Sequence, residues 1–540
     1  MTDDGEPNDP TTKPATTAAA LREPGGASGA RLEYESATDP APRREPEPAA
    51  YGDVSLRGAF WTIGFALANK AVGVASQVAL TWFLLPDALG VVALALSISS
   101  VSAVLTTAGL LNALVQRQVP IEEDAPHFFW LSLAMGLAAM ALMAACAPLA
   151  GRFFNNPEVV PVVLVVAAGF PCAALGTIYQ AKLLRDLKFK EVAAIHSMMT
   201  FARAVASVAM AAAGFGPYAI VVPLLATQAA TPLMLRHAAG PMPIGRPAPR
   251  AWPALLLPTL WLSAYGVAYA LQLYGTNFVI GRYHATDVVG LYFWGFTLSA
   301  QTMFLLASGL RDVLFPTLAK LNDQPERQAE GFRNALRLMM LVSVPVCVVQ
   351  AVTADGLIKL LFRDRWEPVV PVVQYLSFAM LSQPMHVLAH ALLMALGRFR
   401  ALTILGVIQA ALLVAGSVVG ARAGFEREIA IWSGAALLAG GLLAGYASFR
   451  ELGQGAAALF DSFRRTVVPA VVSGLLAWGA ALWLRPHSRI AEVLVATLVL
   501  GFVYTGLACL LAREDVVQLL VRLRMTRLAT RLARPVTQGR

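Results

Sequence analysis

Long stretches that are almost free of charge recur along this chain from Gly58 onward, and each is about twenty residues long. An α-helix of this length spans the hydrocarbon core of a bilayer, and about fourteen such segments can be drawn. They are continuously apolar, whereas the strands of a membrane β-barrel alternate apolar and polar residues. Charged residues make up only 14% of the 540 residues, against about 25% in an average soluble domain. We therefore predict an all-α polytopic membrane protein and exclude a soluble enzyme, a fibrous protein and a disordered hub.

The charges between the predicted spans indicate how the chain crosses the membrane. The spans are 58–85, 88–115, 128–150, 157–180, 191–213, 215–236, 254–280, 286–318, 334–354, 368–396, 401–420, 428–449, 467–484 and 490–512. An even number of spans leaves both termini on one side, and the loops on that side hold about sixteen Lys and Arg against about nine in the others. Because basic loops stay in the cytoplasm, we predict that both termini are cytoplasmic.

The two ends of the chain differ in charge. Residues 1–53 are rich in Pro, Ala, Thr and Gly and carry a net charge of −6, which predicts a disordered acidic cytoplasmic tail. Residues 513–540 place arginines opposite apolar residues at helical spacing. This pattern favours an amphipathic helix on the anionic inner leaflet, with a solvated basic tail as the alternative. The remaining positive charges are spread between spans rather than gathered on one face, so no nucleic-acid partner is predicted.

The chain also contains a weak internal duplication. At an offset of 200 residues, Asp87–Gly90 matches Asp287–Gly290, Trp61 matches Trp261, Gln77 matches Asn277 and Gly109-Leu110 matches Gly309-Leu310. At an offset of 210, Val159–Val163 matches Val369–Val373 and Lys188–Lys190 matches Arg398–Arg400. Several matches in order, at loop positions equivalent in topology, indicate that spans one to six and seven to twelve are related.

This duplication predicts the domain organisation. We expect two homologous six-helix lobes, residues 54–240 and 241–450, followed by two additional transmembrane helices at 451–512. Because six is even, the lobes have the same orientation and are related by an axis along the membrane normal. Transporters that rock two lobes about a central cavity are built in this way.

Several motifs in the chain resemble those of the Wzx-type oligosaccharide flippases. They are Leu56–Trp61, Phe83–Gly90, Gly109–Arg117, Val313–Leu318 and Leu360–Phe362 leading to Arg365-Trp366. These flippases form the polysaccharide transporter family of the multidrug/oligosaccharidyl-lipid/polysaccharide (MOP) superfamily. The resemblance extends from Ser55 to Ala512, which is everything except the two tails.

The resemblance implies a function as well as a fold. It implies fourteen helices that carry undecaprenyl-diphosphate-linked oligosaccharide repeat units from the inner to the outer leaflet of the bacterial inner membrane. Such units are used to build exopolysaccharide, capsule or O-antigen. The protein would then not be an enzyme, it would contact membrane lipids, and a polysaccharide polymerase and a chain-length regulator are its candidate partners.

Two basic residues are predicted at a depth where charge is expensive, about 2.5–3.5 kcal/mol on insertion scales. Lys70 and Arg203 each lie thirteen residues, or about 20 Å, along a helix from a cytoplasmic basic residue. Gln77 continues the face of Lys70 and is predicted to bind the substrate with it, and His196 precedes Arg203 on the same face. We interpret the two as a cationic cavity that binds a diphosphate, because Lys and Arg both pair with phosphate oxygens. An intramembrane ion pair and snorkelling are the alternatives.

The seventh span offers a polar face that suits a sugar. Tyr265, Tyr269, Gln272 and Thr276 follow one another along one side of the predicted helix, and Asn277 is the repeat partner of Gln77. We predict that Tyr269, Gln272 and Asn277 bind the oligosaccharide, with polar packing between helices as the equally weighted alternative.

Arg311 and Asp312 lie near the cytoplasmic end of the eighth span. The family resemblance keeps Arg311 as a substrate-binding candidate. We predict that Asp312 serves a gate or an ion pair between the lobes.

No catalytic, cofactor or metal site is predicted. The loops contain no Gly-rich phosphate loop, Ser/His/Asp arrangement or Asp-x-Asp metal motif. His386 and His390 are four residues apart, but no Glu follows His386 and no third ligand is near in the sequence.

We predict alternating access, in which the diphosphate enters the cavity while the polyprenyl tail stays in lipid. The alternatives are a lipid II flippase or a drug antiporter of the same superfamily, a membrane polysaccharide polymerase or glycosyltransferase, and a non-transporting scaffold. A cation-exporting antiporter needs buried carboxylates, and the first twelve spans hold almost none. A polymerase would expose a large outward loop, whereas the largest here, Ala354–Glu367, is small.

Overall fold

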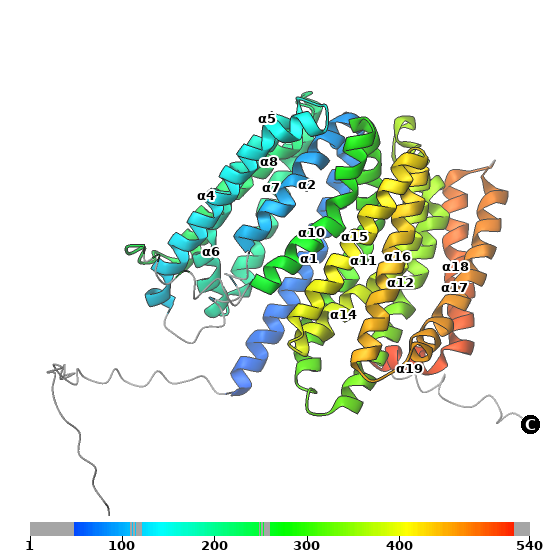
Figure 1. Cartoon of the computed structure of the whole chain (residues 1–540). Helices are drawn as coiled ribbons and strands as arrows, with labels where there is room; N and C mark the ends of the chain where they lie inside the picture. The colour runs from blue at the N-terminus through cyan, green and yellow to red at the C-terminus, as the bar shows by residue number, and fades with distance from the viewer. Residues whose placement is uncertain are drawn as a thin grey trace, which may run out of the picture. The chain divides into compact units, whose positions relative to one another are not determined.

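The computed structural model describes residues 48–107, 111, 114, 121–247, 249, 252, 260–485 and 487–522, and every regular element in this part of the chain is helical. The chain divides into two units, residues 1–52 and 53–540. The second unit holds the helical bundle (Figure 1).

The helices follow the predicted spans closely. In the first half they are α1 (Pro48–Phe83), α2 (Pro86–Thr107), α4 (Ile121–Phe153), α5 (Val159–Ala167), α6 (Gly169–Arg185), α7 (Phe189–Ala212) and α8 (Tyr218–Ala239). In the second half they are α10 (Leu260–Tyr283), α11 (Thr286–Ala319), α12 (Pro325–Leu361), the 3-10 helix η3 (Asp364–Trp366), α13 (Val369–Ala379), the 3-10 helix η4 (Met380–Ser382), α14 (Gln383–Ala395), α15 (Phe399–Ala423) and α16 (Glu426–Glu451). Helices α17 (Ala456–Leu484), α18 (Arg489–Leu511) and α19 (Arg513–Arg522) complete the chain.

Eleven spans of the described residues are long and apolar enough to cross a membrane. The other three predicted spans fall on α1, α10 and α11, whose side chains are described only in part. Two predicted spans are broken near their middle: α5 and α6 meet at Ala168, and η4 separates α13 from α14. The protein is therefore an all-helical, multi-pass membrane protein.

The two halves share backbone details that the duplication predicts. Leu187 and Gly397, 210 residues apart, both adopt a positive φ, of 57° and 66°. The residues that follow them, Lys188 and Arg398, have φ and ψ of −82° and 48° and of −82° and 52°. The same turn therefore ends α6 and α14. Glycine takes this left-handed conformation without a side-chain clash, whereas Leu187 adopts it at some cost.

Helices α2 and α11 bring the two halves into contact at a pair of matched glycines. A Cβ atom on Gly90 would collide with the carbonyl of Thr286, and one on Gly290 would collide with the carbonyl of Pro86. Glycine is required at both places because only hydrogen fits between the backbones. The Thr286 hydroxyl donates a hydrogen bond to Asp87 at the same crossing. The sequence motif that repeats thus meets its own copy.

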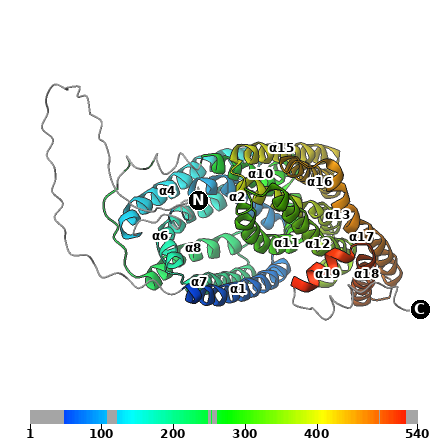
Figure 2. The ribbon, with the colours of Figure 1, turned by 90° about the horizontal axis from the view of Figure 1, so that it is seen from below.

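The arrangement around this crossing is clear from the end of the bundle (Figure 2). Helices α4, α6 and α8 lie on one side of α2, and α12, α13 and α16 lie on the other. Helices α17 and α18 lie beyond α12, and α1 runs beside α7. The amide of Asn69 on α1 donates a hydrogen bond to Ser197 on α7, at 3.0 Å.

Helix ends differ from the prediction where polar residues continue a helix. The tail predicted as disordered through residue 53 ends earlier, because α1 begins at Pro48, and proline is well suited to a first turn. The rest of that tail lies outside the described residues. Helix α12 begins nine residues before its predicted span, and its Arg337 pairs with Asp461 of α17 at 2.9 Å. Helix α19 occupies the start of the predicted basic tail, and residues 523–540 are not among those described.

Candidate functional site

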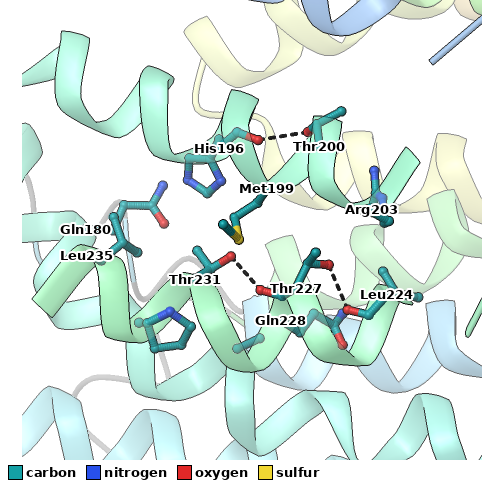
Figure 3. A pocket seen from close by; sticks show the side chains of 13 residues that line it. Gln180, His196, Met199, Thr200, Arg203, Leu224, Thr227, Gln228, Thr231 and Leu235 are labelled. Atoms are coloured by element: carbon teal, nitrogen blue, oxygen red, sulfur yellow. Dashed lines mark hydrogen bonds between the residues drawn. The ribbon is translucent and has the colours of Figure 1, made fainter. Parts of the chain in front are cut away.

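The first half of the molecule contains a polar cavity of about 280 Å³ between α6, α7 and α8, which we call the first-half cavity (Figure 3). Its lining is Ala173, Gly176, Gln180, His196, Met199, Thr200, Arg203, Leu224, Thr227, Gln228, Thr231, Pro232 and Leu235. Side chains of α7 and α8 face each other across it, with His196 toward one end and Arg203 at the other. The predicted shared face of His196 and Arg203 is therefore present.

The first-half cavity has cationic character. Arg203 is an exposed residue of α7, which is long and apolar enough to span the membrane. No ion pair between described residues includes Arg203, so its charge is available to a ligand. The hydroxyl of Thr231 donates to the carbonyl of Thr227 at 2.7 Å, and that of Thr227 donates to Pro223 at 2.9 Å. These hydroxyls keep lone pairs that can accept further hydrogen bonds. The buried Oε1 atom of Gln228 has no hydrogen-bond partner among the described residues.

The second half contains a cavity of about 270 Å³ among α10, α14, α15 and α16, which we call the second-half cavity. Its lining is Tyr265, Tyr269, Gln272, Leu273, Phe296, Gln383, His386, Val387, Ala389, His390, Leu402, Leu405, Gly406, Gln409, Leu437 and Ala444. The rings of Tyr265 and Tyr269 stack with centroids 6.1 Å apart, and Tyr265 lies 5.0 Å from the ring of His390. No Lys or Arg is among these lining residues, so this cavity offers rings and amides instead of cations.

The two cavities are equivalent under the internal duplication. Ala173, Gly176 and Gln180 of the first-half cavity correspond, 210 residues later, to Gln383, His386 and His390 of the second. His196 and Met199 correspond at the same offset to Gly406 and Gln409, and Gln228 and Leu235 correspond at 209 to Leu437 and Ala444. The duplicated bundle therefore places a cavity at the same location in each half, with different side chains.

The predicted site residues do not line one shared cavity; they lie at several separate places in the structure. Arg203 lines the first-half cavity, whereas Tyr269 and Gln272 line the second-half cavity. Lys70 lies half-buried on α1 and lines neither of them. The Gln272 amide donates to the carbonyl of Gly406 at 3.1 Å, so part of its polar capacity is used in packing.

Two predicted residues connect the halves to each other. Gln77 on α1 accepts a hydrogen bond from Gln301 on α11, and buried Asn277 on α10 donates to Ser97 on α2 at 3.1 Å. These repeat partners therefore contact corresponding helices across the interface, at positions that differ by one turn. The side chains of Arg311 and Asp312 lie outside the described residues, although α11 runs through both positions.

Several lining residues were not among the predicted site residues. Thr227, Gln228 and Thr231 form a polar stripe on the otherwise apolar α8, and Gln383 and Gln409 line the second-half cavity. Uncharged polar residues are common in helix packing and therefore give a weak signal in a sequence. Gln409 and His390 correspond in the repeat to Met199 and Gln180, which were not predicted site residues either, so comparing the repeats would not have singled them out.

The two histidines of α14 have separate surroundings. The Nδ1 atom of His386 lies 3.1 Å from the carbonyl of Ser382, and His390 lies against Tyr265. No group of three or more His, Cys, Asp or Glu that could hold a metal is found within the described part of the chain.

Comparisons with known proteins agree with one another. A family model described as "Polysaccharide biosynthesis protein" matches residues 79–371, more than half of the chain. The lipopolysaccharide biosynthesis protein WzxC of Escherichia coli is 22% identical over 60% of this chain and 66% of its own length. The succinoglycan biosynthesis transport protein ExoT of Rhizobium meliloti is 23% identical over 54% of this chain and 60% of its own length. The matched region is thus less than two thirds of each relative.

Solved structures show the same fold. The lipid II flippase MurJ, in an inward closed conformation, matches 85% of this chain and all of its own with a TM-score of 0.69 and 11% identity. An inward-facing multidrug resistance MATE transporter of the MOP superfamily matches 71% of this chain and 94% of its own with a TM-score of 0.58 and 12% identity. At these identities, the likeness establishes the fold and says nothing of the cargo.

Proposed function

This chain belongs to the polysaccharide biosynthesis protein family, and from that premise we propose that it is a flippase for oligosaccharides linked to a polyprenyl diphosphate. The proposed cargo is an undecaprenyl-diphosphate-linked repeat unit of a surface polysaccharide, moved from the inner to the outer leaflet. The names of the curated relatives, which include a transport protein for succinoglycan biosynthesis, support this class of cargo.

The observation that carries the proposal is the glycine crossing between α2 and α11. Two homologous halves touch at matched glycines, and each half keeps its own polar cavity. Interfaces that can separate and close again allow two lobes to rock as rigid bodies. We propose that opening of this crossing exposes the cargo site to the outer side and that its closure exposes the site to the cytoplasm.

The chemistry of the cavities suits the two parts of such a cargo. Arg203 supplies a fixed cation for the diphosphate, and guanidinium groups pair with phosphate oxygens through two parallel hydrogen bonds. The stacked tyrosines and the amides of the second-half cavity suit sugar rings and hydroxyls. We propose that Lys70, half-buried one residue after the Asn69–Ser197 contact, assists the phosphate on its way in.

We place the protein in the bacterial inner membrane with both termini in the cytoplasm. The distribution of Lys and Arg between loops supports this orientation. In Figure 1, α18 ends at the end of the bundle opposite the turn between α1 and α2, as an even number of spans requires. The proposed partners are the cargo, membrane lipids, a polysaccharide polymerase and a chain-length regulator.

The other transport functions are less well supported. MurJ and the MATE transporters share only the fold with this chain, whereas the family model and the curated relatives concern polysaccharide synthesis. A drug antiporter that exchanges cations would need carboxylates in its cavities, and neither cavity is lined by an Asp or Glu among the described residues.

Complementation in a strain that lacks its own flippase tests the proposal. We expect the native chain to restore surface polysaccharide and Arg203→Ala to reduce it at least about tenfold, since a charge-assisted hydrogen bond contributes about 1.5–3 kcal/mol. Lys70→Ala should add to this loss. Arg400→Ala, which removes an exposed arginine at the start of α15, is the matched control. Full polymer output with both Arg203 and Lys70 replaced would exclude the cationic site.

A further inference from the structure

A groove of about 750 Å³ lies between the two halves at the end of the bundle where α4 and α10 terminate, and we call it the outer groove. Helices α2 and α4 of the first half and α10 of the second half line it. Most of the lining is apolar, from Ile98 and Val101 on α2 to Leu142, Cys146 and Leu149 on α4. Leu142 and Leu149 are 46% and 62% exposed, so the groove is open along its side.

Two arginines are the only ionisable side chains, besides the thiol of Cys146, among the described residues that line the outer groove. Arg152 is in the last turn of α4, and Arg282 is in the last turn of α10. The Arg282 guanidinium lies 5.9 Å from the centre of the Phe153 ring. No ion pair between described residues includes Arg152 or Arg282. The groove is thus apolar along its length and cationic at one end.

The dimensions of the outer groove fit a lipid chain. Leu142 and Arg152 are ten residues apart on α4, which corresponds to about 15 Å along the helix axis. This is half of a hydrocarbon core of about 30 Å, so the groove spans one leaflet. A lipid with its headgroup at the arginines would place an acyl chain against the apolar residues.

The equivalent corner of the molecule, formed by α1, α11 and α12, is filled by the protein itself. Trp366 is fully buried there and donates a hydrogen bond from its indole nitrogen to the carbonyl of Thr81, at 2.9 Å. Trp82, the repeat partner of Arg282, donates to the carbonyl of Leu361 at 3.0 Å. Asn156, the residue after the groove-lining Asn155, occupies the position in the first half that Trp366 occupies in the second. The repeated fold therefore does not by itself produce the groove, which is open at only one of the two equivalent corners.

We propose that the outer groove binds an anionic phospholipid of the outer leaflet, with its phosphate at Arg152 and Arg282 and an acyl chain along α2 and α4. The leaflet follows from the proposed orientation, whereas the lipid chemistry does not depend on it. A membrane phospholipid is favoured over the cargo because α2 and α11 are in contact at this end of the bundle. Cargo delivered to the outer leaflet would leave through the opened crossing instead.

A bound lipid would connect the two halves. Its phosphate would contact α4 of one half and α10 of the other, close to where Asn277 bonds to Ser97. Because the lipid binds only while these helices remain side by side, it favours the conformation with the crossing closed. Anionic lipid should therefore stabilise the closed state.

Binding can be measured by native mass spectrometry and by thermal unfolding of the purified full-length protein, with phosphatidylglycerol or phosphatidylcholine added. We expect phosphatidylglycerol to remain bound and to raise the melting temperature more than phosphatidylcholine. Arg152→Gln combined with Arg282→Gln should weaken phosphatidylglycerol binding about tenfold or more, since each basic residue contributes about 1 kcal/mol to anionic lipid binding. The matched control is Arg363→Gln combined with Arg427→Gln, which removes two exposed arginines elsewhere at the same end.

A second variant separates the groove from simple charge attraction. Leu149→Trp fills the outer groove from its exposed rim, keeps both arginines and should also abolish the preference for phosphatidylglycerol. The proposal is wrong if the native protein shows no such preference, or if the double arginine variant or Leu149→Trp retains it. Tighter binding of undecaprenyl phosphate than of phosphatidylglycerol would also overturn it, by assigning the groove to the cargo.

Discussion

The two halves of this protein keep the same backbone and differ in the side chains that line their cavities. The first-half cavity contains Arg203 and His196, whereas the second-half cavity contains the stacked pair Tyr265 and Tyr269. The turn after α6 and the turn after α14 have nearly the same dihedral angles. Duplication thus preserved the features that determine the path of the chain, and the cavity surfaces diverged. This divergence underlies our proposal that one half binds the anionic diphosphate and the other the sugar.

The corners at the end of the bundle where α4 and α10 terminate differ in the same way. Trp366 fills the corner next to α1, and the matching corner next to α10 remains open with two arginines at its end. Matched positions on α1 and α10 can also differ in exposure: Ala68 is exposed, whereas Ala268 is 3% exposed. The difference shows that one fold can leave unequal openings to the lipid on its two sides.

At the glycine crossing, the two halves have the same requirement for glycine, and we expect substitutions there to have the largest effect on export. Gly90→Leu and Gly290→Leu should each abolish export, since either side chain would overlap a backbone carbonyl that cannot move away. Surface polysaccharide in the complemented strain is the measurement. Gly479→Leu is the matched control, because nothing lies within 4 Å of a Cβ atom at that position. If only one of the two glycines is needed, the crossing is not symmetrical.

A smaller effect is expected from the second-half cavity, where we propose that the sugar binds. Tyr269→Ala should reduce export about three- to tenfold, since aromatic stacking contributes about 0.5–1.5 kcal/mol. Tyr269→Phe should retain most of it, because the ring is kept. Tyr446→Ala, on an exposed part of α16, serves as the control. A similar loss for Tyr269→Phe and Tyr269→Ala would assign the role to the hydroxyl group instead of the ring.

The smallest effect on export is expected where α17 and α18 join the second half. Buried Glu492 accepts hydrogen bonds from Arg485 and Arg489, each at 3.0 Å, and Arg489 also pairs with Asp355 of α12 at 3.1 Å. Glu492→Gln should lower the free energy of unfolding by about 2 kcal/mol, because the buried carboxylate loses its charge-assisted hydrogen bonds with two partly exposed arginines, which keep Asp355 as a second partner. Thermal unfolding of the purified protein measures the loss.

The control for this variant is Glu330→Gln, which changes an exposed carboxylate near the N-terminal end of α12, far along the helix from Asp355. Export at the growth temperature should be nearly normal for both, because neither residue lines a cavity. A melting temperature unchanged by Glu492→Gln would show that α17 and α18 are held by apolar packing alone.

Much of the fold could be predicted because its signals are local. In the part of the chain that the structure describes, every predicted span falls on helical segments, two of them interrupted near the middle, since continuous apolar residues of sufficient length leave the helix as the only way to satisfy backbone hydrogen bonds in lipid. The duplication was visible in short motifs such as Asp87–Gly90 because turns and close crossings tolerate few residue types. The exact helix ends were less predictable, as α12 and α17 extend past the apolar residues into ion-paired segments.

The site was predictable only in part. Arg203, Tyr269 and Gln272 do line cavities, and the face shared by His196 and Arg203 is present. The expectation that Lys70 and Arg203 occupy one cavity stays a prediction, because depth along a helix says nothing about which way the helix faces. Gln228 and Gln409 could not be distinguished from packing residues without the positions of their neighbours.

The sequence by itself determined the number of spans, the repeat and the presence of costly charges within the membrane. These follow from hydrophobic length and from short-range steric limits, which act within a few residues. Only the tertiary structure decided which helices enclose a cavity, that Gly90 and Gly290 meet, and that one outer corner is filled by Trp366 while its counterpart is open. Those outcomes depend on how side chains distant in the sequence fill the space between helices, and no local pattern encodes that volume.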